Sequence, residues 1–437
     1  MRINSKKNIR DFFVGLDEKV CNSEGHCIEG INFDNAATTP PIKSSIECIQ
    51  RLSNTYASIG RGTGQKSQIT TDLYYASKEF IMEFFNVRDK NRYVVIYVNN
   101  TTEGINKLSK TLLKEDNDEV VISSRMEHHS NDLPWRNRGK VDYIDVDKEG
   151  RLKIDELEEK LKNNFGKVKY VSLTGASNVT GYVNDIHYIA KIVHKYGAKI
   201  IIDAAQLVPH KRIKMSGETE AEDIDFLVFS SHKIYSPFGV GVVIGLKEEF
   251  EKVNPDYSGG GTVDLVLDNK VIYLPPPEKC EPGTPNFFGV MSLINSLSFI
   301  NTIGYDYIEE HEKILLEHTF NGLKSIPEII NYGDVENTSD RLGIATFNIK
   351  KMYHRDVAEI LAKKNGIAVR HGWFCAHPYC RRLMNMTEKE AGLFLENPNE
   401  KMFGMVRISF AIYNSLNEVD TFLNVIEDIC SKQNYNK

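Results

Sequence analysis

The chain has 437 residues, of which 41% are hydrophobic and 26% are charged, and its formal net charge is −6. This length allows more than one domain, and the composition is ordinary for a globular protein. The acidic balance argues against a nucleic-acid-binding surface, and no run of about 18 apolar residues predicts a membrane span.

The start of the chain and its cysteines indicate the compartment. The first twenty residues are polar and charged and lack the apolar segment of a secretory signal. An odd, dispersed set of cysteines in a long chain predicts reduced thiols rather than a disulfide framework. We therefore expect a cytoplasmic protein. The cysteines are Cys21, Cys27, Cys48, Cys280, Cys375, Cys380 and Cys430.

Short apolar runs alternate with longer amphipathic stretches through the middle of the chain. Residues 185–197 have apolar side chains on one helical face, and Gly197 is placed as a C-cap. Alternation of strands and helices, with strands that are apolar throughout, predicts a mainly parallel α/β sheet. Strands are predicted at residues 93–98, 119–124, 169–175, 198–205, 225–231 and 239–245.

The pattern changes after about residue 300. Residues 304–326 predict a long amphipathic helix, and mixed strands and helices follow to the end of the chain. We therefore expect a large α/β domain at 31–300 and a smaller α+β domain at 301–437. The first segment, 1–30, is expected to pack on the smaller domain.

Polar residues follow the predicted strands, where ligands bind in open α/β sheets. Thr101 and Thr102 come after the first of these strands and open a helix, which suits a phosphate, although an ordinary N-cap gives the same pattern. His128 and His129 follow the next strand, where they are metal ligands, a stacking platform or surface residues. Asn178 lies in a polar turn after a third strand.

An acid and a lysine complete this edge of the sheet. Asp203 ends a buried run, where a carboxylate is costly unless it is paired, and Lys233 follows the next strand. A partly desolvated lysine has a lowered pKa and is available as a free amine. A phosphate site, an aromatic ring, a carboxylate and a lysine are the groups that pyridoxal phosphate requires. Ser230 and His232 are placed to help hold its phosphate.

The motifs "NNTTEGIN", "MEHHSNDLPW", "SNVTG", "IDAAQ", "FSSHKIYSPFGVG", "EPGTPN", "IAVRHGWFCAHP" and "VRISFAIYN" occur in this order. With them the chain resembles the class V-fold (fold type I) pyridoxal-phosphate enzymes, and it looks most like the Suf-type (group II) cysteine desulfurases and selenocysteine lyases. The resemblance runs from about residue 32 to residue 415. It implies the aspartate aminotransferase-like fold, with a large cofactor-binding domain and a small C-terminal domain.

The resemblance also implies roles for single residues. Lys233 forms the Schiff base and moves protons, Asp203 keeps the pyridine nitrogen protonated, and His128 stacks on the ring. Thr284 matches a residue that reaches the phosphate of a neighbouring subunit, which implies a homodimer. The implied cofactor contacts are Thr101, Thr102, His128, Asn178, Asp203, Gln206, Ser230, His232, Lys233 and Thr284.

Substrate binding is implied for three residues. Arg407 matches the arginine that holds the substrate carboxylate, a bidentate task for which a guanidinium group is suited. Asn178 lies within reach of the substrate, and Arg61 matches an arginine near the mouth of the active site.

Cys375 decides between reactions. It matches the desulfurase nucleophile, whose thiolate takes sulfur from cysteine and leaves alanine and an enzyme persulfide. The chain departs from the pattern at Trp373 and Phe374, where the family has histidines, and in a long stretch at 384–401 that is placed to cover the site. An apolar flank raises the pKa of a thiol.

Alternatives therefore stay open. Cys375 is otherwise a small buried filler in an aminotransferase, an epimerase or another amino-acid lyase of the same fold. A scaffold that binds the cofactor without catalysis is a third interpretation. No metal site is expected, because Cys375 and Cys380 have no further ligands nearby in the sequence. The desulfurase interpretation adds a sulfur-accepting protein as a possible partner.

Overall fold

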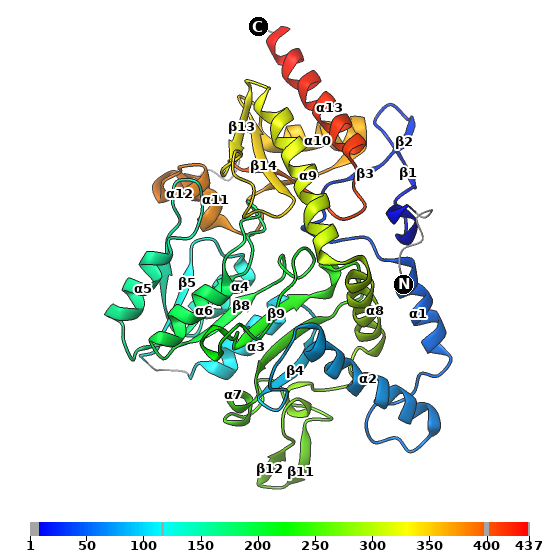
Figure 1. The fold of residues 1–437 in the computed structure, drawn as a ribbon, viewed down its shortest axis with the longest axis vertical. Helices are drawn as coiled ribbons and strands as arrows, with labels where there is room; N and C mark the ends of the chain where they lie inside the picture. The colour runs from blue at the N-terminus through cyan, green and yellow to red at the C-terminus, as the bar shows by residue number, and fades with distance from the viewer. Residues whose placement is uncertain (1–7, 115–117, 397–401, 436–437) are drawn as a thin grey trace.

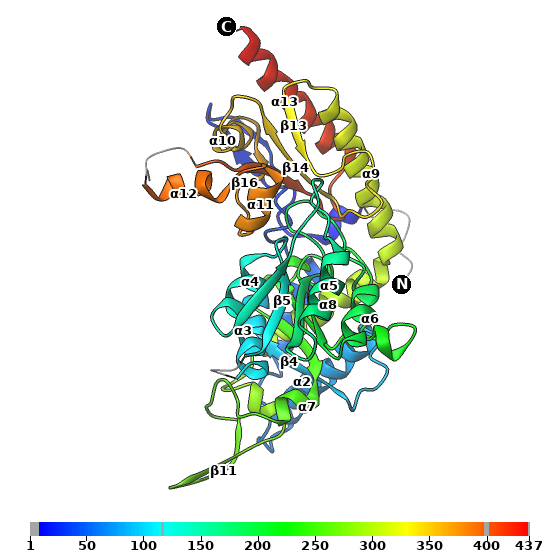
Figure 2. The same cartoon turned by 90° about the vertical axis from the view of Figure 1, so that its left-hand side faces the viewer.

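The computed structural model describes residues 8–114, 118–396 and 402–435. Figure 1 shows a large α/β unit in the lower part of the molecule and a smaller unit above it, with α13 at the top. Figure 2 shows the same two parts from the side. Each part has its own hydrophobic core.

The large unit is built on a seven-stranded sheet. Neighbouring strands are parallel except at β10 (Gly241–Leu246), which is antiparallel to both of its neighbours. Strands β4, β9 and β10 are mostly apolar and are buried along their length, which is typical of a sheet covered on both faces. This confirms the predicted mainly parallel sheet. The strand order is β4 (Tyr93–Val98), β10 (Gly241–Leu246), β9 (Phe226–Ser230), β8 (Lys199–Asp203), β7 (Val168–Thr174), β5 (Val120–Ser124) and β6 (Lys140–Ile144).

Helices cover this sheet (Figure 1). In α6 (Ile186–Lys195), the predicted apolar face is buried. The Asp185 side chain caps the first turn, and Gly197 follows the last turn with φ +72°. The helices of this unit are α1 (Lys43–Ser53), α2 (Gln65–Phe84), α3 (Thr101–Leu112), α4 (His129–Arg136), α5 (Ile154–Asn163), α6 (Ile186–Lys195), α7 (Lys247–Glu251) and α8 (Phe287–Ile303).

The smaller unit has an antiparallel four-stranded sheet packed against helices. Its strands, in order, are β13 (Ile329–Tyr332), β14 (Ile344–Ile349), β17 (Met405–Ser409) and β16 (Arg370–Gly372). Its helices are α9 (Tyr305–Lys324), α10 (His354–Asn365), α11 (His377–Leu383), α12 (Glu388–Glu396) and α13 (Leu416–Tyr435). This is the α+β arrangement that the sequence predicts after residue 300.

The N-terminal segment contacts both units. Phe13 is buried in the core of the large unit. A hairpin of β1 (Lys19–Cys21) and β2 (Cys27–Glu29) leads into β3 (Ile31–Asn32), which pairs in parallel with β15 (Ile367–Ala368) of the small unit. The packing of 1–30 on the small unit, of which residues 1–7 lie outside the described residues, and the division at residues 30 and 300 stay predictions.

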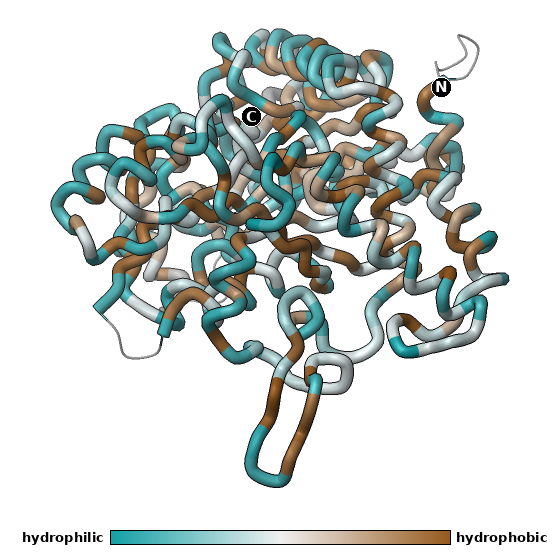
Figure 3. Tube along the Cα trace, turned by 60° about the horizontal axis from the view of Figure 1, so that its bottom comes forward, coloured by the Kyte–Doolittle hydropathy of each residue, from teal (hydrophilic) through white to brown (hydrophobic). Residues whose placement is uncertain are grey.

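The remaining elements are short. A hairpin of β11 (Val263–Leu267) and β12 (Lys270–Tyr273) projects from the large unit, and Figure 3 shows it as a largely hydrophobic arm. Four 3₁₀ helices lie at Ile9–Phe12, Glu220–Glu222, Ser231–Lys233 and Glu278–Cys280. Within the described residues no single helix is long and apolar enough to cross a membrane; only α8 and α9 taken together, bent by 78°, would be.

Close packing at one sheet edge positions the start of α3. A Cβ atom on Gly241 of β10 would lie 2.6 Å from the carbonyl carbon of Asn100, so a side chain there would displace that backbone. Gly104 packs in the same way on Val228 of β9. Glycines at both places bring the first turn of α3 against the ends of β9 and β10.

Candidate active site

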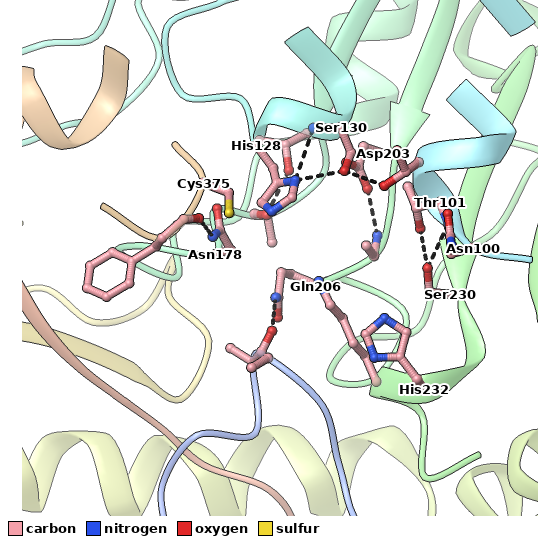
Figure 4. Close-up of a pocket in the computed structure, with 18 of the residues that line it drawn as sticks. Asn100, Thr101, His128, Ser130, Asn178, Asp203, Gln206, Ser230, His232 and Cys375 are labelled. Atoms are coloured by element: carbon pink, nitrogen blue, oxygen red, sulfur yellow. Dashed lines mark hydrogen bonds between the residues drawn. The ribbon is translucent and has the colours of Figure 1, made fainter. Parts of the chain in front are cut away.

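A pocket of about 400 Å³ lies at the carboxyl ends of β7, β8 and β9. The start of α3 lies at one end of the pocket, and the β16 and β17 region of the small unit, whose Cys375 carbonyl contacts the start of α4, lines another part of it. Figure 4 shows side chains around it from the ends of β8 and β9, from the starts of α3 and α4, and from the segment that holds Cys375. Those lining it are Ala36, Ala37, Asn100, Thr101, Thr102, His128, Ser130, Thr174, Ala176, Asn178, Asp203, Ala205, Gln206, Ser230, His232, Lys233, Arg370, Phe374, Cys375 and Arg407.

The start of α3 makes one end of the pocket suitable for an anion. Asn100 caps the helix by accepting a hydrogen bond from the Glu103 amide. The Thr101 amide donates to Ser230 Oγ at 2.7 Å, and the hydroxyls of Thr102 and Ser130 share a hydrogen bond of 2.7 Å. A helix N-terminus with hydroxyl groups around it attracts negative charge and suits a phosphate.

Two histidines in the pocket are neutral at ordinary pH. His128 caps α4, and its Nδ1 accepts a hydrogen bond from the Ser130 amide at 3.1 Å. Burial and the nearby Lys233 lower the pKa of His128 to about 3 and that of His232 to about 4. The His128 ring is therefore uncharged, and its stacking on a ligand stays a prediction.

Asp203 and Lys233 perturb each other's ionisation. The Asp203 carboxyl is buried, and burial raises its pKa, while a hydrogen bond from the Ala205 amide (3.0 Å) and the charge of Lys233 oppose the rise. Burial lowers the pKa of Lys233 to about 8, against the opposing effect of Asp203. A lysine with this pKa is a free amine in a substantial fraction of molecules near neutral pH.

Arg407 of β17 is buried and forms an ion pair with Asp34. Its Nη1 donates to the Asn178 carbonyl at 2.7 Å and its Nη2 to Asp34 Oδ1 at 3.2 Å. Arg370 of β16 pairs with the same Asp34, at 2.7 Å. Burial lowers the pKa of Arg407 to about 10, so it stays charged at neutral pH. The two guanidinium groups form an anion-binding side of the pocket opposite α3.

Two buried polar atoms indicate what the pocket accommodates. Gln206 Oε1 and Arg407 Nε have no hydrogen-bond partner among the described residues, and both side chains line the pocket. Buried polar groups are normally paired, so these atoms indicate a polar ligand. With the anion end at α3, the Lys233 amine and the Asp203 carboxyl, the donor set fits pyridoxal phosphate, which carries a phosphate, an aldehyde and a pyridine nitrogen.

Cys375 lies in an irregular segment that is held at its backbone. Phe374 and Cys375 both have left-handed backbones, with φ +50° and +53°. The Asn178 side chain donates to the Phe374 carbonyl at 2.8 Å, and the His129 amide donates to the Cys375 carbonyl at 2.7 Å. Trp373 and Phe374 are buried, whereas Cys375 is exposed in the pocket wall. The alternative that Cys375 is a buried filler is therefore wrong.

Three expected features lie outside the pocket. Arg61 is exposed and donates to the Val263 carbonyl at 3.3 Å, and Thr284 is also exposed. Helix α12, in the long stretch at 384–401, packs through Ala391 on the cluster that holds Trp373. Its described residues therefore support the cysteine segment from outside and do not line the pocket; 397–401 lie outside the described residues.

Sequence reasoning missed several residues that the fold brings to the pocket. Asp34 lies behind the lining and pairs with Arg407 and Arg370, because β3 pairs with β15 and the next residues lie alongside Ser409 of β17. Asn100 and Ser130 also line the pocket, but the sequence analysis assigned roles only to residues beside them, namely Thr101, Thr102 and His128. Their position at the start of a helix could have indicated them, because a serine or asparagine there commonly accepts a hydrogen bond from an unpaired backbone amide.

Comparison with known proteins agrees with this geometry. Residues 31–422 match the family model for aminotransferase class-V. A protein named probable cysteine desulfurase from Pyrococcus abyssi is 34% identical over 410 residues, covering 92% of this chain and 94% of that protein. A cysteine desulfurase from Wigglesworthia glossinidia brevipalpis is 33% identical over 430 residues, covering 95% of each chain.

Solved structures give the same result. The apo structure of a cysteine desulfurase from Thermococcus onnurineus superposes with a TM-score of 0.81 at 31% identity, covering 92% of this chain and 95% of that one. An S-sulfonic acid form of a cysteine desulfurase from Escherichia coli gives 0.77 at 26% identity, with the same coverage. By family model, relatives and fold alike, the chain belongs to the aminotransferase class-V family of pyridoxal-phosphate-dependent enzymes.

Proposed function

We propose that this enzyme is a cysteine desulfurase, or a selenocysteine lyase of the same type. It would break the bond between Cβ and sulfur or selenium, leaving alanine, with sulfur carried as a persulfide on Cys375. The observation that carries the proposal is the exposed Cys375 thiol in the wall of the pocket that also presents Lys233 and Arg407. The relatives' names support the same reaction.

The sheet side of the pocket would hold the cofactor. Bound pyridoxal phosphate supplies a ring that withdraws electrons from the amino-acid Cα. Thr101, Thr102, Ser230, His232 and His128 all line the pocket. The first four would contact the phosphate, and His128 would cover the ring. The buried carboxyl of Asp203 would face the pyridine nitrogen and keep a proton there.

Contacts from the remaining residues would orient substrate and move protons. Arg407 would bind the α-carboxylate, and the Lys233 amine would take the proton from Cα and return one later. The Cys375 thiolate would attack the substrate sulfur, so that an S–S bond forms while the Cβ–S bond breaks. The electron pair of the broken bond stays with the carbon fragment, which is protonated to alanine.

Cys375→Ser tests this proposal. The variant should form no alanine from L-cysteine, because a hydroxyl does not take up sulfur, and it should still bind cofactor and amino acids, because Lys233 and Arg407 are unchanged. The matched control is Cys48→Ser, a partly exposed cysteine outside the pocket. Alanine, sulfide and pyruvate are assayed together, and mass spectrometry should find a persulfide on Cys375 in the wild type. Full activity of Cys375→Ser would leave an aminotransferase, an epimerase or another lyase.

We also propose that the enzyme is a homodimer in which each subunit completes the site of the other. Thr284 and Arg61 are exposed and lie outside the pocket of their own chain, which leaves them available to a second copy. The β11–β12 hairpin beside Arg61 exposes Leu265, Val266 and Val271, an apolar surface that a partner subunit would cover (Figure 3). Sedimentation should find a dimer, and a fully active monomer would contradict the proposal.

Location and sulfur delivery are the remaining parts of the proposal. We place the enzyme in the cytoplasm, where thiols stay reduced, and all seven of its cysteines are free. The exposed position of Cys375 supports transfer of its persulfide sulfur to a thiol of an acceptor protein.

A further inference from the structure

Two exposed cysteines face each other across the β1–β2 hairpin, no residue of which lines the pocket. The antiparallel register pairs Cys21 with Cys27, and their sulfur atoms are 3.8 Å apart. Toward the turn, the Asn22 amide donates to the His26 carbonyl at 2.9 Å, so Asn22 and His26 form a hydrogen-bonded pair. Cys21 and Cys27 therefore occupy the adjacent non-hydrogen-bonded position, where opposite side chains of two strands lie closest.

The hairpin already holds the backbone in a geometry that a disulfide requires. A disulfide bond is about 2.05 Å long, so the two sulfur atoms need to approach by about 1.8 Å, which side-chain rotation supplies. Asn22 Oδ1 accepts hydrogen bonds from the amides of Glu24 (3.0 Å) and His26 (2.9 Å), which closes the turn. The backbone therefore loses little further conformational entropy when the disulfide forms.

We propose that Cys21 and Cys27 form a reversible intramolecular disulfide, which makes the hairpin a redox modification site. The oxidant is a low-molecular-weight disulfide such as oxidised glutathione. One cysteine thiolate attacks it, forming a mixed disulfide and releasing one glutathione thiolate. The second cysteine thiolate attacks the protein sulfur of the mixed disulfide and releases the second glutathione. Two protein thiols are oxidised, one external disulfide is reduced to two thiols, and the two thiol protons pass to the released glutathione thiolates.

Contacts of the hairpin determine what the disulfide would hold. The Ser23 amide donates to the Lys363 carbonyl at 2.6 Å, and the Asn22 side chain donates to the Lys364 carbonyl at 3.4 Å, both at the end of α10. The hairpin then runs into β3, which pairs with β15. Oxidation would therefore stiffen the turn that contacts the end of α10. This inference does not depend on the proposed reaction.

Oxidation is measured on the cofactor-bound full-length enzyme with mixtures of reduced and oxidised glutathione, followed by alkylation and trypsin digestion. Both cysteines fall in one tryptic peptide, residues 20–43, and Cys48 falls in the next, 44–51. The wild-type 20–43 peptide should lose both alkyl groups together and regain them after dithiothreitol. Hydrogen exchange should slow in residues 19–32 on oxidation.

Single variants separate this site from ordinary exposed thiols. In Cys21→Ser, a glutathione that becomes attached to Cys27 is not displaced, because the second thiol is missing. The glutathionylated fraction of the 20–43 peptide should therefore be at least about tenfold higher in this variant than in the wild type. Cys48→Ser is the control and should oxidise at residues 20–43 like the wild type. The proposal is overturned if the wild-type peptide stays doubly alkylated, keeps glutathione to the same extent as Cys21→Ser, or links two chains instead of closing within one.

Discussion

The two walls of the pocket hold their chemical groups by different means. On the sheet wall, Asp203 ends β8, Ser230 ends β9 and Lys233 closes the 3₁₀ turn that follows, so each position is set by a buried strand. On the opposite wall, Phe374 and Cys375 lie outside regular structure with left-handed backbones.

That difference has an energetic side. A left-handed conformation costs about 1–2 kcal/mol for a residue other than glycine. Hydrogen bonds from the Asn178 side chain and the His129 amide to the carbonyls of Phe374 and Cys375 offset this cost. The sheet wall thus fixes ionisable groups at low local strain, whereas the cysteine segment is held in a strained form that leaves its thiol exposed. We expect changes on the sheet wall to slow or stop every reaction that uses the cofactor, and changes on the other wall to impair substrate binding or sulfur removal while the cofactor stays bound.

The largest effect is expected for Lys233→Ala. Turnover and the borohydride-reducible cofactor linkage should both disappear, because no other amine in the pocket replaces Lys233 among the described residues. Lys43→Ala, an exposed lysine at the start of α1, is the control. Absorbance after borohydride treatment and alanine formation are the measurements. Normal turnover in Lys233→Ala would remove the sheet wall from its assigned role.

Asp203→Ala is expected to have the next largest effect on turnover. The rate should fall by about 10²- to 10⁴-fold because charge that develops during the reaction loses its stabilising partner. Cofactor should still bind through the start of α3 and Lys233. Single-turnover kinetics and the cofactor absorbance separate these two effects. Near-normal kinetics would mean that another group faces the pyridine nitrogen.

Arg407→Lys tests the opposite wall. A lysine keeps the charge but loses bidentate binding, so KM for cysteine should rise about 10- to 100-fold with a smaller change in kcat. Arg355→Lys, an exposed arginine on α10 paired with Glu359, should leave both constants unchanged. Steady-state kinetics with cysteine provide the measurement. A fall in kcat alone, with KM unchanged, would place Arg407 in the chemical step instead.

The smallest effect concerns pH. Burial lowers the pKa of Lys233 to about 8, and only the neutral amine attacks an aldehyde. The rate of pyridoxal phosphate capture by the apo-enzyme should therefore rise about tenfold from pH 7 to pH 9, with its midpoint near 8. Stopped-flow absorbance follows the reaction. A midpoint near that of an ordinary lysine, about 10.4, would show that the amine is not desolvated.

Much of the sheet wall was predictable because its signals are local. A strand that is buried on both faces is a continuous apolar run, and the residue that ends it lies at the carboxyl edge of the sheet. Asp203, Ser230 and Lys233 could therefore be placed from residues 198–205 and 225–233 alone. Predicted strand ends differ from the structure by only one or two residues at most of these positions.

The opposite wall depends on pairings between distant segments. Asp34 contacts Arg407 across 373 positions of sequence, because β3 pairs with β15 and because β16 and β17 place Arg370 opposite Arg407. No local periodicity encodes such a contact. The exposure of Cys375 is of the same kind, since the sequence left a buried filler open as an alternative and the fold buries Trp373 and Phe374 but not Cys375.

By itself, the sequence determined the sheet, the lysine and the acid at its edge, and the family that these motifs resemble. These features follow from the identity and order of neighbouring residues. Only the tertiary structure decided that Asp34 joins two arginines, that α12 lies behind the cysteine segment, and that the Cys375 thiol faces the pocket. Each of these depends on side chains from separate elements meeting in space, and that is set by how the two units pack together.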